Sequence, residues 1–238
     1  MIDVREAAVS FGGVKALDNV SITCSLGQIV GVVGPSGAGK STLFDAISGR
    51  HPLVSGSISI GGATIDGMAP QVVARRGLAR TYQEDRLFTS MTVLDNVFAG
   101  AHLVGAMHSE ALARSVLESL GLRDRANAHV WELAPGERRR VALARAIASS
   151  AKALVLDEPL RSLDESELEV VRTVLRGIAN ESGGRAILIS DRDVDAIAGL
   201  CDRVVALHAG KAIAHGTFDE VVRDVDVRDA YLGVEWRQ

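Results

Sequence analysis

The sequence contains few aromatic residues and few cysteines. Aromatic residues make up 4% of its 238 residues, so the core has to be built mainly from Val, Ile, Leu and Ala. That composition is typical of a buried parallel sheet flanked by helices. The two cysteines, Cys24 and Cys201, lie far apart and fit neither a disulfide framework nor a metal-ligand spacing. We therefore expect both to be reduced, as in a cytosolic protein.

Excess positive charge and long apolar runs are absent as well. The formal net charge is -4 at pH 7, and no polybasic arm indicates a nucleic-acid or lipid surface. The N-terminus lacks the basic and apolar regions of a signal peptide, and no apolar run approaches the ~20 residues of a transmembrane helix. If the protein works at a membrane, we expect another chain to supply the membrane span.

The length and the patterning indicate one α/β unit with an inserted subdomain. Hydrophobic residues make up 47% of the chain, which favours a folded globule over disorder. The pattern predicts strands at residues 2–4, 20–24, 28–33, 57–60, 63–65, 153–156, 186–190, 204–207 and 212–214. It predicts helices at residues 41–48, 93–104, 109–119, 138–148 and 165–179.

Residues 34–41 form a glycine-rich phosphate-binding motif. They match G-x-x-x-x-G-K-[ST] between an apolar strand and a helix. The glycines let the main chain curl so that several N–H groups face one concavity, and the next helix directs its positive end there. We expect Lys40 to reach the β- and γ-phosphates of ATP and the Ser41 hydroxyl to ligate Mg²⁺. The other predicted nucleotide contacts are Gly34, Pro35, Ser36, Gly37, Ala38, Gly39 and Thr42.

This motif sets the predicted fold class. A glycine-rich turn without a ligand is the alternative, but it leaves the lysine and the hydroxyl without a purpose. We expect an α/β fold, with a P-loop NTPase RecA-like core, an antiparallel β subdomain and an inserted helical subdomain. The whole of 1–238 forms a single domain, in which 1–83 and 149–238 make the core and 84–148 the helical subdomain.

Two acids follow a second apolar strand. Asp157 and Glu158 come directly after residues 153–156. The carboxyl ends of strands in an open α/β sheet are where ligands bind. We expect Asp157 to bind Mg²⁺, through water, and Glu158 to orient and activate the attacking water. The alternative is a solvent-exposed strand end, which the upstream phosphate motif disfavours.

In order and spacing, these motifs resemble the ABC ATPases over nearly the whole chain. A finer match, to the ATPases of branched-chain amino-acid importers and their relatives, rests on residues 11–17, 79–88 and 230–233. The resemblance implies a cytoplasmic ATP-binding subunit that lies peripherally on the inner face of the cell membrane. Its partners would be transmembrane permease subunits that take up amino acids or similar small polar solutes, and no nucleic acid.

The resemblance also assigns roles to single residues. Phe11 falls where the family places an aromatic ring that stacks on adenine, and a core phenylalanine is the alternative. Gln83 falls at the glutamine that senses Mg²⁺ and the γ-phosphate, so it counts as both a catalytic and a metal-binding candidate. Residues 162–164 match a loop that communicates across the family's dimer.

The sequence departs from the family at its signature loop, Leu-Ser-Gly-Gly-Gln. Residues 133–137 read Leu-Ala-Pro-Gly-Glu, so Ala134 removes the serine hydroxyl and Pro135 removes one N–H. Gly136 stays unchanged and remains a candidate contact for nucleotide bound by the opposite subunit. A lost charge-assisted hydrogen bond is worth roughly 1.5–3 kcal/mol, so dimer closure is expected to weaken.

A second departure lies after residues 186–190. Family members have a histidine that contacts the γ-phosphate, and alignment on Cys201 puts Arg192 in its place. Arginine is longer and always charged. We keep it as a catalytic candidate that either holds phosphate or pairs with a nearby acid such as Glu158.

These departures favour a heterodimer with an intact ATPase partner over a homodimer, because a homodimer carries both defects in both sites. The leading hypothesis is an ATPase that drives a permease, with weak hydrolysis of its own. The alternative is a hydrolysis-deficient regulatory or assembly subunit, which the intact Glu158 disfavours. The basic run at residues 138–140 is interpreted as a solvated helix face rather than a nucleic-acid patch.

Overall fold

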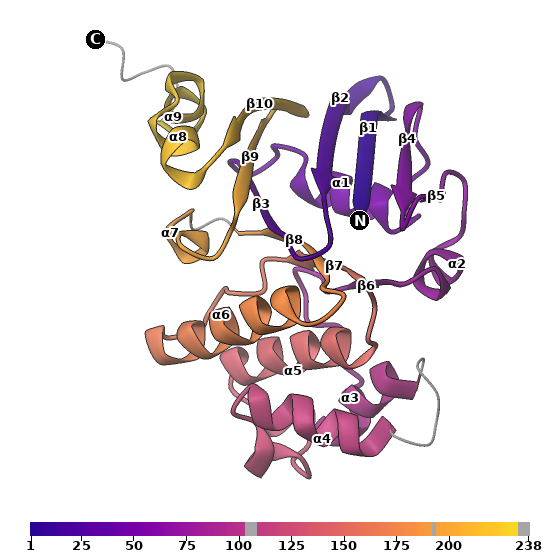
Figure 1. Ribbon diagram of the computed structural model, residues 1–238, viewed down its shortest axis with the longest axis vertical. Helices are drawn as coiled ribbons and strands as arrows, with labels where there is room; N and C mark the ends of the chain where they lie inside the picture. Colours follow the sequence, from indigo (N-terminus) through magenta and orange to yellow (C-terminus); the bar gives the residue numbers. More distant parts are fainter. Residues whose placement is uncertain (103–108, 192–193, 233–238) are drawn as a thin grey trace.

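A six-stranded sheet runs through the centre of the computed structural model, which describes residues 1–102, 109–191 and 194–232 (Figure 1). Its strand order is β10-β9-β3-β8-β7-β6, parallel except for β10. The strands are β3 (Ile29–Val33), β6 (Leu78–Arg80), β7 (Ala153–Asp157), β8 (Ala186–Ser190), β9 (Arg203–His208) and β10 (Lys211–Gly216). Every residue of β3, β7 and β8 is buried, which explains their uninterrupted apolar sequences.

A second, four-stranded sheet has the order β2-β1-β4-β5 and is antiparallel. It consists of β1 (Ile2–Phe11), β2 (Val14–Cys24), β4 (Ser55–Ile60) and β5 (Ala63–Thr64). The first two strands are longer than the sequence predicted. Register shifts after Val4 and Ala7, and a positive φ of 49° at Glu6, interrupt the alternation that marks a strand. The pattern therefore missed the middle of this hairpin.

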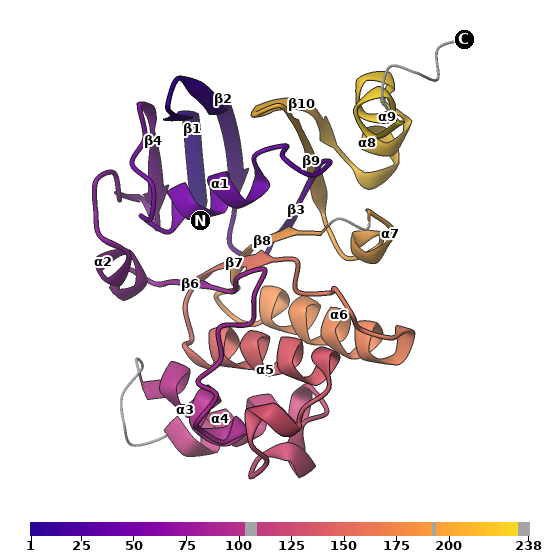
Figure 2. The same ribbon diagram turned by 180° about the vertical axis from the view of Figure 1, so that it is seen from behind.

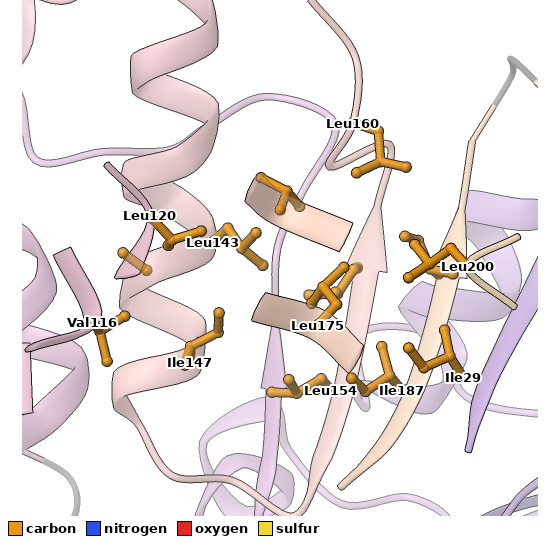
Figure 3. Close-up of a cluster of buried hydrophobic side chains, with 14 of the residues drawn as sticks. Ile29, Val116, Leu120, Leu143, Ile147, Leu154, Leu160, Leu175, Ile187 and Leu200 are labelled. Carbon is orange, nitrogen blue, oxygen red and sulfur yellow. The ribbon is translucent and has the colours of Figure 1, made fainter. Parts of the chain in front are cut away.

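The central sheet separates two hydrophobic cores. Val30 and Val32 of β3 pack with α1 (Lys40–Ile47) and the antiparallel sheet, whereas Ile29 and Val33 face the helices on the other side. This alternation follows from the period of two along a strand. Figure 3 shows the helix side, where side chains of α5 and α6 meet those of β3, β7 and β8.

The segment between β6 and β7 is mainly helical. It contains α3 (Val93–Ala101), α4 (Ser109–Ser119) and α5 (Pro135–Ala148), with single 3-10 turns at Arg123–Arg125 and Val130–Glu132. Helix α6 (Glu165–Asn180) follows β7 and lies beside α5, while α3 and α4 lie on the far side of α5 (Figure 2). The predicted helix at 93–104 ends earlier, at residue 101, and residues 103 and 104 lie outside the described residues.

Several short elements escaped the sequence prediction. They are β6, α2 (Pro70–Arg75), α7 (Val194–Ile197), α8 (Phe218–Arg223) and α9 (Val225–Leu232). Each is short, so the apolar pattern has too few repeats to show its period. Among the described residues, no helix is long and apolar enough to cross a bilayer.

Leu175 of α6 tests the helix-side core. Its side chain is fully buried between α5 and the sheet (Figure 3). We expect Leu175→Ala to lower the free energy of unfolding by about 2–5 kcal/mol, because it removes buried apolar atoms and leaves a cavity. Urea denaturation at an unchanged m-value measures the loss. Thr173→Ala, on the exposed side of the same helix, is the control and should shift stability by less than about 0.5 kcal/mol. Equal shifts in both variants would contradict this packing.

Candidate active site

The phosphate-binding loop joins β3 to α1 and can be built only from small residues at its tightest points. Gly34, Gly37 and Gly39 have φ values of 152°, 80° and 106°. A Cβ added to Gly34 would lie 2.2 Å from the carbonyl oxygen of Leu207, and one added to Gly39 would lie 2.8 Å from that of Ala16. At these two positions the main chain of the loop packs directly against the carbonyls of Leu207 and Ala16, and no side chain fits between them.

Helix α1 begins without a side-chain cap. Its N-cap residue is Gly39, which offers no side chain to the first N–H groups of the helix. Those groups and the positive end of the helix dipole form a site suited to an anion. Lys40, the first residue of α1, is buried, and its Nζ donates to the carbonyls of Gly34 and Pro35, the second at 3.1 Å. The ammonium thus sits within the loop that is predicted to hold phosphate.

A cavity of about 440 Å³ opens beside this loop. It gathers seven of the predicted nucleotide contacts with two side chains from elsewhere in the chain. Its lining includes Ser36, Gly37, Ala38, Gly39, Lys40, Ser41, Thr42, Gln83 and Glu158. The lining does not include the predicted site residues Gly34, Pro35, Phe11, Asp157 and Gly136.

The sequence interpretation missed two segments of the cavity wall. They are residues 14–16, after the β1–β2 turn, and residues 209–210, between β9 and β10. Gly210 donates its N–H to Ala38 at 3.0 Å and accepts from Asp18 at 2.8 Å, so this turn supports the loop from outside. No signal in the local sequence of this turn ties it to a nucleotide.

The two acids at the end of β7 are buried rather than solvent-exposed, so the alternative of an exposed strand end is wrong. Asp157 Oδ1 accepts from the Ser190 hydroxyl at 2.9 Å, and its Oδ2 lies 3.5 Å from Arg80 Nη2. Glu158 has a positive φ of 48°, and Gln83 Nε2 donates to its Oε2 at 3.2 Å. Arg161 Nη1 lies 3.7 Å from the same oxygen.

Arginines of α5 hold the segment that carries Gln83. Arg139 Nη1 donates to the main-chain carbonyl of Gln83 at 2.8 Å and lies 3.0 Å from an oxygen of Asp85. Arg145 Nη1 donates to the carbonyl of Arg86 at 2.9 Å. Burial raises the pKa of Asp85, while Arg139 and other nearby arginines oppose that rise.

These contacts correct the interpretation of residues 138–140 as a solvated face. Arg139 and Arg140 are buried, with 9% and 8% of their surfaces exposed. Arg140 Nη2 lies 2.6 Å from Glu167 of α6, and its Nη1 donates to the carbonyl of Leu120. Sequence pattern alone missed this, because the acceptors that allow a guanidinium to be buried come from distant segments.

The signature-like loop leads into α5. Ala134 occupies the N-cap position without a side-chain hydrogen bond, and its N–H donates to Glu137 Oε2 at 2.9 Å. Arg125 Nε donates to the other carboxylate oxygen at 2.8 Å. Burial alone would raise the pKa of Glu137, but these two bonds leave it below its ordinary value. A Cβ on Gly136 would lie 2.7 Å from Glu167 Oε2 and 3.0 Å from the carbonyl oxygen of Ser162, so a larger residue there requires both neighbours to shift.

Of the two remaining candidate residues, Phe11 and Arg192, the structure describes only Phe11. Phe11 ends β1 with 46% of its surface exposed, and its ring makes an edge contact with His51 at 4.9 Å. The alternative of a core phenylalanine is therefore wrong, and adenine stacking stays a prediction. Arg192 lies outside the described residues.

The cysteines carry no reactive thiolate at neutral pH. Burial raises the pKa of Cys24 and of Cys201 to about 12. Both are free cysteines in the structure, Cys24 buried and Cys201 partly buried.

Comparison with known proteins gives matches along the whole chain. A profile of the family described as ABC transporter matches residues 17–161, and one described as branched-chain amino acid ATP-binding cassette transporter matches residues 213–236. The high-affinity branched-chain amino acid transport ATP-binding protein LivG of Salmonella typhimurium (strain LT2) is 32% identical over 250 residues, covering 98% of each chain.

Two solved structures support the same assignment. The ADP conformation of MJ1267, an ATP-binding cassette of an ABC transporter, matches with a TM-score of 0.87 and 26% identity, covering 98% of both chains. The dimeric structure of MJ0796, a bacterial ABC transporter cassette, matches with a TM-score of 0.83 and 25% identity, covering 92% of this chain and 99% of that one.

The predicted fold class and the resemblance stated from the sequence are both confirmed by these matches. The family profile covers more than half of the chain, and the LivG relative aligns over nearly all of it. The chain therefore belongs to the ABC transporter family as an ATP-binding ATPase subunit, with a clear likeness to the subunits of branched-chain amino acid importers.

Proposed function

We propose that the chain binds MgATP at a dimer interface and hydrolyses it to drive a membrane permease that takes up amino acids or similar small polar solutes. The observation that carries this proposal is the single cavity where Lys40, Ser41, Gln83 and Glu158 meet. A cationic side chain, an uncapped helix start and a carboxylate in one cavity suit phosphate binding followed by attack of water. The likeness to LivG supports the solute class.

In this function the loop holds the phosphates through its main-chain N–H groups. Lys40 exchanges the carbonyls of Gly34 and Pro35 for phosphate oxygens, which is a short movement within one cavity. Thr42 adds a hydroxyl beside Ser41 at the start of α1. The exposed ring of Phe11 stacks on adenine.

The donor set fits Mg²⁺, which prefers oxygen ligands and keeps several waters and substrate phosphates in its shell. Ser41 and Gln83 line the cavity and would ligate the ion with their side-chain oxygens. Asp157 lies outside the lining and would bind the ion through a water molecule. Bound Mg²⁺ neutralises charge on the β- and γ-phosphates. The polar contacts of Asp157 with Ser190 and Arg80 hold its carboxylate in one orientation.

Glu158 orients and activates the attacking water. Its burial and its left-handed main chain direct the carboxylate into the cavity, and Gln83 donates to the same carboxylate. Gln83 thereby connects the metal side of the site to the water side. Its main chain is held by Arg139 of α5, so the stretch 84–148, which we propose as a helical subdomain, is mechanically linked to the cavity.

A heterodimer with an intact ATPase partner accounts best for the signature-like loop. Gly136 does not line this chain's own cavity, which suits a role toward nucleotide on an opposite subunit. Ala134 has no side-chain donor, and Glu137 is already bonded to Ala134 N–H and Arg125. The assembly would lie on the inner face of the cell membrane, with the permease supplying the span.

The alternative, a hydrolysis-deficient regulatory or assembly subunit, is favoured by one observation. The Glu158 carboxylate is already engaged by Gln83 and lies close to the guanidinium of Arg161. A carboxylate held in this way activates water poorly unless the contacts change when ATP binds. ATP binding without turnover would make this alternative the better account.

Substitution of the acid tests hydrolysis directly. We expect Glu158→Gln to lower phosphate release from MgATP by about 10²-fold or more, because the amide cannot act as a base. ATP binding, measured in parallel, should stay within about twofold, since Glu158 is not expected to hold the phosphates.

The control is Glu169→Gln, an exposed acid on α6, which should leave phosphate release unchanged. Release from the Glu158→Gln variant at the wild-type rate would contradict the assigned role. Wild-type binding with no release above this variant would select the regulatory alternative.

Repair of the signature-like loop tests the heterodimer proposal. We expect the double variant Ala134→Ser with Pro135→Gly to raise the turnover of the chain on its own by about tenfold or more, because it returns a hydroxyl and an N–H donor. Ala111→Ser, an exposed serine placed on α4, is the control and should have no effect. Unchanged turnover in the double variant would show that this loop does not limit hydrolysis.

A further inference from the structure

We propose that Lys15 of β2 is a further nucleotide-binding residue, whose ammonium binds the α-phosphate of ATP or ADP. The inference deepens the proposed function and rests on it, because it requires nucleotide phosphates in the cavity beside the phosphate-binding loop. It gives a role to residues 14–16, a part of the cavity wall that the sequence interpretation missed.

The start of β2 is fixed between the phosphate-binding loop and the β9–β10 turn. A Cβ added to Gly39 would lie 2.8 Å from the carbonyl oxygen of Ala16, and one added to Gly210 would lie 2.8 Å from the same oxygen. The carbonyl of Gly210 accepts from the N–H of Asp18 at 2.8 Å. Strand β10 also lies beside β2 (Figure 1, Figure 2). The main chain of Lys15, next to Ala16, is therefore held close to the loop.

The cavity wall carries two cations and one acid. Among the described residues that line it, the cations are Lys15 and Lys40, and the acid is Glu158. In the proposed function Lys40 and Mg²⁺ neutralise charge on the β- and γ-phosphates. The α-phosphate then needs a cation of its own, and Lys15 is the cavity cation that the proposed function does not use.

The position of Lys15 in the β1–β2 hairpin selects the α-phosphate. Phe11, whose ring is proposed to stack on adenine, pairs with Val14 across a two-residue turn. Ala16, two residues after Val14, packs against Gly39 at the start of α1. Lys15 therefore lies between the proposed place of adenine and the loop that is proposed to hold the β- and γ-phosphates.

The ammonium of Lys15 is paired with Asp18, an acid that has a second cation beside it. Lys15 Nζ lies 3.0 Å from Asp18 Oδ1, and Lys211 Nζ lies 3.5 Å from Oδ2 of the same carboxylate. The hydrogen bond from Lys15 is the largest of the effects that lower the pKa of Asp18, and desolvation opposes it. A lysine on its flexible four-carbon stem can turn from Asp18 to a phosphate. Lys211 then still pairs with Asp18, so the exchange leaves no acid without a cation.

Removal of the Lys15 charge should weaken the binding of ATP and ADP alike. Both nucleotides carry an α-phosphate, so we expect Lys15→Met to raise the Kd of each about three- to tenfold, as for one charged hydrogen bond that solvent partly screens. The difference from the wild type should shrink at high salt, because the ammonium is exposed. The value of kcat at saturation should stay within about twofold, because Glu158 and Gln83 are untouched.

Lys211→Met is the matched control. The side chains of Lys15 and Lys211 are 65% and 64% exposed and both pair with Asp18, but of the two only Lys15 lines the cavity. Lys15→Arg keeps the positive charge and should keep most of the affinity. Binding of ATP and of ADP to the full chain is measured at low and high salt, by competition with a fluorescent ATP analogue. The urea midpoint is measured in parallel, and both methionine variants should leave it nearly unchanged.

Three results would overturn the inference: wild-type affinity in Lys15→Met, an equal loss of affinity in Lys211→Met, or a loss for ATP with none for ADP. A loss in Lys15→Met that salt does not change, together with a lower urea midpoint, would also overturn it, since the residue would then have a structural role. Failure of the wild type to bind either nucleotide would instead count against the proposed function.

Discussion

The rest of the site depends on the close approach of bare main chain at Gly34. The carbonyl of Leu207 occupies the place where a side chain would begin, and Gly39 meets the carbonyl of Ala16 in a similar way. Because the parallel strands of the central sheet end at one edge, loops that follow β3, β7 and β9 meet there. Glycine at the contact points lets these loops pack closely enough to present N–H groups, a lysine and a carboxylate to one cavity.

Buried arginines make the second constraint. Three arginines of α5 bind main-chain carbonyls and acids on other segments: Arg139, Arg140 and Arg145. These contacts connect the helices between β6 and β7 to the core. A guanidinium can be buried only where several acceptors surround it. The position of Gln83 therefore depends on α5. A movement of these helices would shift Gln83 and, through its hydrogen bond, the carboxylate of Glu158.

Local motifs explain which features could be predicted. The phosphate-binding loop and the acids after β7 are contiguous in sequence, and the helices Ser109–Ser119 and Glu165–Asn180 repeat their apolar pattern often enough to be recognised. The prediction was wrong where the pattern was interrupted or too short, as in the bulged hairpin of β1 and in α8 and α9. It was also wrong for Arg139 and Arg140, because burial of a charged side chain depends on partners that the local sequence does not reveal.

The sequence by itself determined the chemistry: a curled loop with Lys40 and Ser41, and two acids at the end of an apolar strand. Tertiary structure alone decided which groups these residues meet. It exposed Phe11, joined Gln83 to Glu158, and buried Arg139 against the main chain of Gln83. The physical reason is that motif geometry follows from main-chain preferences over a few residues, whereas these contacts depend on how strands and helices from distant parts of the chain pack around one sheet edge.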